Sequence, residues 1–284
     1  MNTPENDLVD SSLWCQLNVR FPVWKNAETV VLTHLAPLLR AAEDDGMLTE
    51  WFIIRKSPCW RLRYVPAPGL PDRLGQDLDA LITNQRITGW TEIIYEPETH
   101  AFGGPEAMAC AHRLFHHDSR NLLDHLHGAH GEHRREISML LCSLLMRSAG
   151  LDWYEQGDVW ARVCTHRTPP PRIEQTSSDR LNAAVHRLIT VNGEEMMRTG
   201  GPLADITGWA RAYVEAGEDL KHLAESGQMH RGLRDVLAHH VLFAWNRIGL
   251  PYPTQTTLAT TAKNIIFGPD PTTDGSAITH VDNP

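Results

Sequence analysis

The segment EWFIIRKSPCWRLRYV, residues 50–65, contains two short runs rich in apolar, β-branched and aromatic residues, separated by Ser57 and Pro58. Runs of this length and composition, interrupted by turn residues, are typical of β-strands that pair through a tight connection. We therefore expect residues 50–56 and 59–65 to form a hairpin. This hairpin predicts an antiparallel sheet in the first third of the chain.

The flanking sequence adds further strands and helices to this hairpin. Roughly alternating polar and apolar residues predict strands at 14–21 and 90–98, and helical spacing of apolar residues predicts helices at 26–46 and 70–85. Beyond residue 104 the spacing is helical almost throughout. The expected helices there are 105–127, 132–149, 177–190, 205–225, 230–248 and 254–266. The predicted fold class is α+β, with a small antiparallel sheet from the N-terminal third packed against a larger helical portion.

The expected domain organisation is one large domain with variable ends. Residues 12–267 form the domain, and residues 167–178, with three consecutive prolines, form an internal linker because proline cannot continue a helix. Residues 1–11 are expected to be flexible, and residues 268–284 have the composition of a disordered tail.

Composition excludes several classes of function. The chain has 26 Lys and Arg against 35 Asp and Glu, a formal net charge of -9, which argues against general nucleic-acid binding. It has no apolar run long enough to span a membrane. The N-terminus has no signal-peptide pattern, and the 5 cysteines are widely spaced, so we expect a cytoplasmic protein with reduced thiols.

The histidine-rich segment HRLFHHDSRNLLDHL, residues 112–126, raises the question of a metal site. His112 and His116 lie four residues apart, which places both rings on one face of a helix, as zinc sites often require. The sequence HRLFH, however, has no glutamate beside the first histidine, so the metalloprotease pattern is absent. We expect no metal and no other cofactor, and keep His116 as a candidate catalytic residue.

Two further groups carry polar chemistry. Arg61 and Arg63 alternate along a strand and so project from one face, where they either form salt bridges or clamp a carboxylate or peptide carbonyl. Asp118 and Ser119 follow the paired histidines, and either hold local structure through hydrogen bonds or contact a substrate.

Three other segments supply candidates. In YEPETHAFGG, residues 95–104, Glu98 is a candidate, and the two glycines indicate a turn. In GLDWYEQGDVW, residues 150–160, Tyr154 and Glu155 are candidates for lining a cavity. In LAHHVLFAWNRIGLP, residues 237–251, His240 and Arg247 share a helix face, and Asn246 needs hydrogen-bond partners if it is buried.

The order of these motifs resembles the thiopeptide-type bacteriocin biosynthesis family, which is related to the C-terminal, glutamate-eliminating domain of lantibiotic dehydratases. The resemblance extends over about residues 12–267. The motifs that carry it are WFIIRKSPCWRLRY (51–64), YEPETHAFGG (95–104), LFHHDS (114–119), RREISMLLCSLLMRSAGLDWYEQGDVW (134–160) and HHVLFAWNR (239–247).

The resemblance implies an enzyme that matures a ribosomally made precursor peptide. One branch eliminates glutamate from a glutamyl ester of Ser or Thr. The other joins two dehydroalanines by a formal aza-[4+2] cycloaddition, then expels water and the leader peptide to leave a pyridine. Neither reaction needs a metal. A third possibility is a non-catalytic subunit that binds the leader for a partner dehydratase.

The sequence departs from the eliminating branch at two positions. Where that branch has an arginine before the aromatic residue of its glycine turn, this chain has Ala101 before Phe102. Where it has a histidine in the late helix, this chain has Leu242, although His239 or His240 offers a substitute from the preceding turn. These departures favour the cyclising branch.

The hypothesis assigns roles residue by residue. Arg61 and Arg63 polarise the reacting amide, and His116, Tyr154 or His240 transfers protons. The leader peptide binds along the N-terminal sheet, by strand addition or against its helices, and a glutamylating dehydratase subunit is a possible partner. The expected substrate-binding residues are Trp60, Glu98, Asp118, Ser119, Glu155, Asn246 and Arg247.

Overall fold

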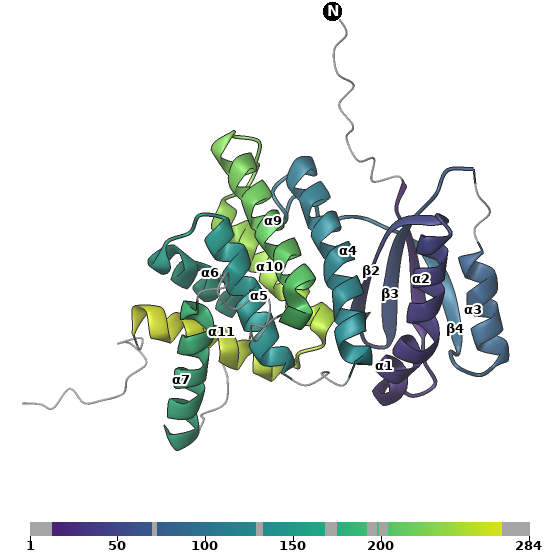
Figure 1. Cartoon of the computed structure of the whole chain (residues 1–284), viewed down its shortest axis with the longest axis horizontal. Helices are drawn as coiled ribbons and strands as arrows, with labels where there is room; N and C mark the ends of the chain where they lie inside the picture. The colour runs from purple at the N-terminus through teal and green to yellow at the C-terminus, as the bar shows by residue number, and fades with distance from the viewer. Residues whose placement is uncertain are drawn as a thin grey trace, which may run out of the picture.

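The computed structural model describes residues 13–69, 73–128, 133–167, 175–191, 198 and 204–268. The predicted flexible N-terminus, most of the proline-rich linker and nearly all of the predicted tail lie outside these residues. Figure 1 shows a sheet with its covering helices at one end of the molecule and a helical body at the other, with helix α4 between them. The α+β prediction is therefore confirmed.

The sheet has four antiparallel strands in the order β2-β3-β1-β4. The strands are β1 (Cys15–Arg20), β2 (Leu48–Lys56), β3 (Cys59–Pro66) and β4 (Gly89–Ile94). The predicted hairpin is confirmed, because Lys56 pairs with Cys59 across the two intervening residues. The predicted strand at 90–98 ends earlier, at Ile94, and the residues after it form the loop that leads to α4.

Helices cover one face of the sheet and make up the rest of the fold. On the sheet lie α1 (Ala27–Val30), a π-helical turn (Val31–Leu35), α2 (Ala36–Asp44) and α3 (Leu74–Thr83). The helical body comprises α4 (Pro105–His127), α5 (Arg134–Ser148), α6 (Trp153–Thr165), α7 (Gln175–Thr190), α9 (Thr207–Glu225), α10 (Leu233–Ile248) and α11 (Tyr252–Phe267). Short 3-10 turns cover Trp24–Asn26 and Ala204–Ile206.

Helix α6 is the main element that the sequence analysis missed. Asp152 accepts a hydrogen bond from the Glu155 backbone at 2.8 Å, and Glu155 accepts one from the Asp152 backbone at 3.0 Å. This reciprocal pair is a capping box, which satisfies two amide groups at a helix start. The D-x-x-E spacing ahead of Gln156 was therefore the available signal.

Alternation along the strands sends side chains into two different cores. Trp51, Ile53, Trp60, Leu62 and Tyr64 face α2 and α3 and form a sheet core with them. The opposite face carries Phe52 and Ile54, which pack with aromatic residues of α4 and of the loop before it. A separate, larger core fills the space among the helices.

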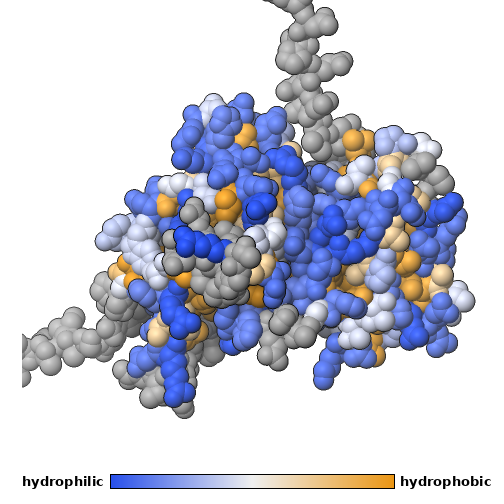
Figure 2. All heavy atoms as spheres, in the orientation of Figure 1, coloured by the Kyte–Doolittle hydropathy of each residue, from blue (hydrophilic) through white to orange (hydrophobic). Residues whose placement is uncertain are grey.

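The hydropathy of the molecular surface varies along the face shown in Figure 2. Figure 2 shows that hydrophilic residues predominate over the middle of this face, where α4 lies, while apolar residues show between α2 and α3. Among the described residues, no helix combines the length and apolar character needed to cross a membrane.

Candidate active site

Arg61 and Arg63 project from β3 on the face of the sheet away from α2 and α3. Arg63 is buried, and its Nε donates a hydrogen bond to Gln16 Oε1 on β1 at 2.8 Å. The Arg63 Nη1 and Arg61 Nε atoms are also buried, but no hydrogen-bond partner is found for either among the described residues. Buried guanidinium N–H groups without partners are costly, so this face is suited to an incoming carbonyl or carboxylate.

Tyr95 and His112 lie directly beside this pair. A hydrogen bond of 2.9 Å joins the Tyr95 hydroxyl to His112 Nε2, and the Arg63 guanidinium carbon lies 4.3 Å from the centre of the Tyr95 ring. Burial, and then the charge of Arg63, lowers the pKa of His112 to about 3. Burial also raises the pKa of Tyr95, which outweighs the opposing effect of Arg63. Both groups are therefore neutral at neutral pH and share one hydrogen bond.

Glu98 adds a carboxylate in the loop that follows β4. Its Oε2 atom is buried, with no hydrogen-bond partner found in the described structure, and its charge raises the pKa of Arg63 against the larger effect of burial. The loop closes on itself, because the Phe102 amide donates to the Glu98 carbonyl at 3.1 Å. Gly103 and Gly104 have φ values of 93° and 114°, so the predicted turn is confirmed.

We call these five residues, Arg61, Arg63, Tyr95, Glu98 and His112, the arginine cluster. The cluster borders a part of the sheet face where β4 is open to solvent, since Thr91 is exposed and Ile93 is 43% exposed. On its other side, Phe102, Phe115 and Phe243 form what we call the aromatic wall. The rings of Phe115 and Phe243 stack there with their centres 5.5 Å apart. The arrangement combines cations, a carboxylate and a neutral acid–base pair next to a buried aromatic cluster.

His240 lies behind this wall rather than in the cluster. It is 1% exposed, its ring centre lies 5.0 Å from that of Phe102, and neither ring nitrogen has a partner among the described residues. Burial, and then Arg247 and His239, lowers its pKa to about 3. Within the described part of the chain, His240 therefore makes no polar contact with the arginine cluster.

Asp118 and Arg247 form a buried ion pair. Their side chains are 2% and 0% exposed, and Arg247 Nε donates to Asp118 Oδ2. The other carboxylate oxygen accepts hydrogen bonds from Trp209 Nε1 at 2.6 Å and from the Tyr213 hydroxyl at 2.9 Å. Of the two alternatives left open for Asp118, the geometry therefore favours a structural role, joining α4, α9 and α10.

His116 and Ser119 contact the outer strand of the sheet. Strand β2 is an edge strand, and its backbone amides at Trp51 and Ile53 lie 3.1 Å from His116 Nδ1 and 3.2 Å from Ser119 Oγ. An uncovered sheet edge exposes unpaired amides, and natural proteins commonly cover it. These two side chains therefore cap β2 and attach α4 to the sheet.

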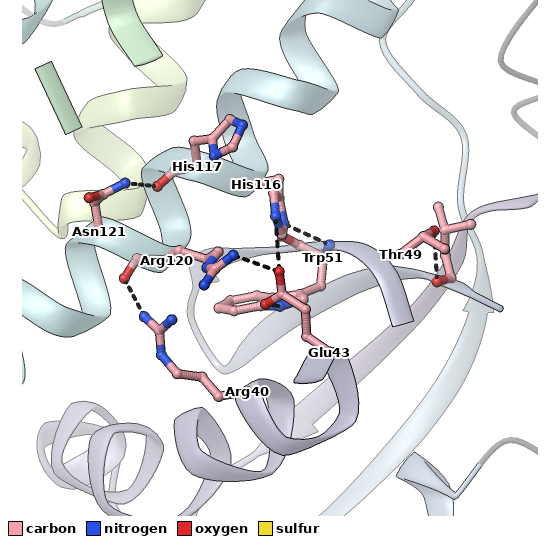
Figure 3. A network of polar contacts seen from close by, with 9 residues as sticks. Arg40, Glu43, Thr49, Trp51, His116, His117, Arg120 and Asn121 are labelled. Carbon is pink, nitrogen blue, oxygen red and sulfur yellow. Dashed lines mark hydrogen bonds and ion pairs between the residues drawn. The ribbon is translucent and has the colours of Figure 1, made fainter. Parts of the chain in front are cut away.

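The other ring nitrogen of His116, Nε2, faces Glu43 of α2. Figure 3 shows Glu43 of α2 between His116, Arg120 and Trp51. Glu43 Oε1 lies 3.4 Å from His116 Nε2 and accepts from Arg120 Nη1 at 2.7 Å, while Glu43 Oε2 accepts from Trp51 Nε1 at 2.9 Å. Burial lowers the pKa of His116, which keeps it neutral. The sequence singled out His116, but these contacts do not bring it into the arginine cluster.

Four other predicted site residues lie elsewhere. Trp60 belongs to the sheet core on the opposite face from Arg61. Tyr154, which we expected to line a cavity, is 65% exposed and stacks on Phe267. Glu155 completes the cap of α6.

Asn246 is the fourth of these residues and lies near the end of α10. It is half-buried, and its Oδ1 accepts a hydrogen bond from Gln255 Nε2 at 3.2 Å. The structure therefore brings together Arg61, Arg63 and Glu98, and adds Tyr95 and His112. His112 was noted only for its spacing, and no local pattern pairs it with Tyr95.

Comparisons with known proteins are consistent with this fold. No curated protein gives a significant match. Among solved structures, the tRNA-dependent lantibiotic dehydratase MibB from Microbispora sp. 107891 is similar, with 16% identity over 94% of this chain and a TM-score of 0.63. TsrL is also similar, with 17% identity over 91% of this chain and 99% of its own, and a TM-score of 0.58.

At these identities the likeness concerns the fold. The chain spans 29% of the length of MibB, so it corresponds to one part of that larger enzyme. A family profile described as the C-terminal part of lantibiotic biosynthesis dehydratases matches residues 14–265, which include every strand and nearly all of the described helices. The protein belongs to the lantibiotic biosynthesis dehydratase C-terminal family.

Proposed function

We propose that the protein matures a dehydroamino-acid-containing precursor peptide, as a cyclase that forms a pyridine by a formal aza-[4+2] cycloaddition and then eliminates water and the leader peptide. The observation that carries this proposal is the arginine cluster. It places two guanidiniums with unpartnered buried N–H groups beside a neutral, hydrogen-bonded Tyr95–His112 pair.

The chemistry needs a polarised amide and a proton carrier. Arg61 and Arg63 hydrogen-bond the amide oxygen, which stabilises the imidic form that acts as the aza-diene. Tyr95 takes the amide N–H proton on its oxygen while its own proton passes to His112 Nε2. Tyr95 then donates a proton to the imidic oxygen and is reprotonated by the His112 imidazolium, which is a strong acid because the pKa of His112 is about 3.

The same carrier serves the later eliminations. Loss of water needs a proton delivered to the departing hydroxyl and one removed from carbon, and release of the leader as an amide needs the same pair of transfers. Glu98, with one carboxylate oxygen unpartnered in the described structure, is placed to accept the carbon-bound proton. The aromatic wall formed by Phe102, Phe115 and Phe243 keeps the inner side of the arginine cluster apolar.

The direct test is mass spectrometry of a dehydroalanine-bearing precursor incubated with the protein. Loss of water together with the leader supports the cyclase. A Tyr95→Phe variant should lower kcat by about 10²-fold or more, because it removes the proton carrier. Tyr154→Phe, which removes a hydroxyl from an exposed ring, is the matched control and should retain full turnover. Full turnover by Arg61→Ala or Tyr95→Phe would contradict the assigned roles.

Elimination of glutamate is the second candidate function. It is favoured by the family and by the likeness to MibB, a tRNA-dependent lantibiotic dehydratase. The same Arg61–Arg63 pair would then bind the glutamyl carboxylate. Loss of glutamate from a preformed glutamyl ester, with no change in a dehydroalanine peptide, would replace the cyclase by this activity. Absence of both reactions, with tight leader binding, would leave a non-catalytic partner subunit.

A further inference from the structure

A second polar site lies on the other side of the sheet, where α1, the end of β2 and the start of α5 meet the end of α10. Two adjoining hollows of about 400 Å³ and about 510 Å³ share Arg134, Gly249 and Leu250 as lining residues. We call them together the Arg55 groove, after the arginine on its floor. None of the arginine cluster residues lines it.

The charge of the Arg55 groove is opposite to that of the whole chain. The formal net charge of the protein is -9. The charged residues that line the groove are four basic ones and two acidic ones: Lys25, Arg55, Arg134, Arg135, Glu28 and Glu136. A local excess of positive charge on an acidic protein attracts an acidic partner and orients it.

The floor of the groove is a preorganised guanidinium pair. Glu28 accepts two hydrogen bonds from Arg134, at 2.6 and 2.9 Å, and a further one from Arg55. Burial would raise the pKa of Glu28, but the hydrogen bond from Arg134 and the charge of Arg55 outweigh it and lower this pKa to about 2. One ionised carboxylate therefore already binds between two arginines.

Arg55 retains unused hydrogen-bonding capacity. Its side chain is 10% exposed, its guanidinium lies 4.5 Å from the centre of the Trp60 ring, and its Nε and Nη2 atoms have no hydrogen-bond partner among the described residues. Because an undercompensated buried cation is unfavourable, the floor favours a second carboxylate. Gly249, with φ 81°, helps to keep the space open, since a Cβ there would lie 2.9 Å from Arg55 Nη1.

The rim adds apolar surface to this charge. Trp24 is 42% exposed and lines the groove next to Lys25, and Val23 is 52% exposed. An exposed aromatic ring beside cations fits a peptide in which acidic residues alternate with apolar ones. A long polyanion such as RNA is disfavoured, because the acidic surface beyond the groove would repel it.

We propose that the Arg55 groove binds an acidic and apolar segment of the peptide substrate, remote from the residues that react. This proposal rests on the proposed function only in identifying the peptide as the substrate. An anchoring site of this kind holds the peptide while the reacting part reaches the arginine cluster, and so raises its local concentration there. It corresponds to leader binding against the helices of the N-terminal sheet.

The test is fluorescence anisotropy of the full chain with a fluorescein-labelled peptide of alternating Glu and Leu residues. Lys25 and Arg135 are exposed at the rim, so the double variant Lys25→Glu/Arg135→Glu should fold and should weaken binding at least tenfold. Arg86→Glu/Arg180→Glu makes the same change in net charge at exposed positions outside the groove, and should alter binding less than twofold.

Several results would overturn the proposal. These are equal binding by the two double variants, equal binding of a Lys-Leu peptide, or tighter binding of a short single-stranded RNA that competes for the same site. The binding assay requires no turnover, so it separates this proposal from the proposed function. If the precursor is converted and Lys25→Glu/Arg135→Glu leaves KM unchanged, the groove is not the anchor although the enzyme assignment stands.

Discussion

The residues of the segment LFHHDS, at 114–119, divide their work among three different neighbours. His116 and Ser119 cover the edge of β2, and Asp118 forms the ion pair with Arg247. Phe115 is part of the aromatic wall beside the arginine cluster. A motif that looks like a catalytic constellation in sequence is therefore chiefly the attachment of α4 to the sheet and to α10.

The Asp118–Arg247 pair should be the most sensitive polar contact of the helical body. Asp118→Asn leaves a buried guanidinium without its counter-charge, and should lower the free energy of unfolding by about 3–5 kcal/mol. The exposed pair Arg113–Asp219 has an N–O distance of 2.8 Å with both side chains about half exposed, and is the matched control. Asp219→Asn should cost less than about 1 kcal/mol. Urea denaturation measures both, and equal effects would contradict the structural role.

His240 should make the protein sensitive to acid. Its folded pKa of about 3 lies below the ordinary value of 6.5, so the unfolded chain binds the proton first as the pH falls. The stability is thus complete above pH 6.5 and decreases by about 1.4 kcal/mol per pH unit between that value and the folded pKa. A His240→Leu variant should show a correspondingly smaller loss between pH 6.5 and 4.5. Parallel stability–pH curves for the two proteins would exclude this explanation.

At the scale of helices, small residues determine how closely α5 and α9 approach. A Cβ on Gly217 of α9 would lie 2.5 Å from the Leu145 carbonyl oxygen of α5, whereas a Cβ on Gly208 of the same helix would find its nearest neighbour at 3.7 Å. Backbone of the facing helix cannot move aside as a flexible side chain can. The close packing of the two helices therefore depends on Gly217.

Two alanine variants on α9 test this contact. Gly217→Ala should lower the free energy of unfolding by about 1–3 kcal/mol through overpacking, although alanine is the better helix former. Gly208→Ala has room and should instead raise stability by up to about 1 kcal/mol. Thermal denaturation followed by circular dichroism compares them. A stabilised Gly217→Ala protein would show that α9 can move away from α5 to make room for a Cβ.

At the scale of the molecule, α4 joins parts that otherwise have separate cores. Leu122 packs in the helical core and Leu123 in the sheet core, while Phe115 belongs to the aromatic wall. Since neighbouring residues of one helix serve different cores, loss of either core should unfold the other. We therefore expect cooperative unfolding of the sheet and helical parts.

Hydrogen exchange can test this cooperativity. Leu123→Ala should reduce stability by about 2–5 kcal/mol, and should reduce protection of β3 and α5 amides by the same free energy. Ile82→Ala, at a 37% exposed position of α3, is the control. It should change the free energy of unfolding and the protection of these amides by less than about 0.5 kcal/mol. Loss of protection confined to β3 would show that the two parts unfold independently.

The sequence by itself determined the hairpin, the α+β class and most helix boundaries, because these depend on local spacing of apolar residues and on turn residues. The family also followed from motif order. The start of α6 also has a local signal, the D-x-x-E capping box, whereas for the strand expected at 90–98 periodicity did not mark the end at Ile94.

Only the tertiary structure decided which polar residues act together. Tyr95 and His112 are 17 positions apart, in the loop after β4 and on α4, and Arg63 lies on β3, so their contacts depend on how α4 packs on the sheet. The same packing placed His116 against the edge strand β2 and His240 behind the aromatic wall. Residue type shows what a side chain can do chemically, but burial and partners, which arise from long-range packing, determine what remains available for a substrate.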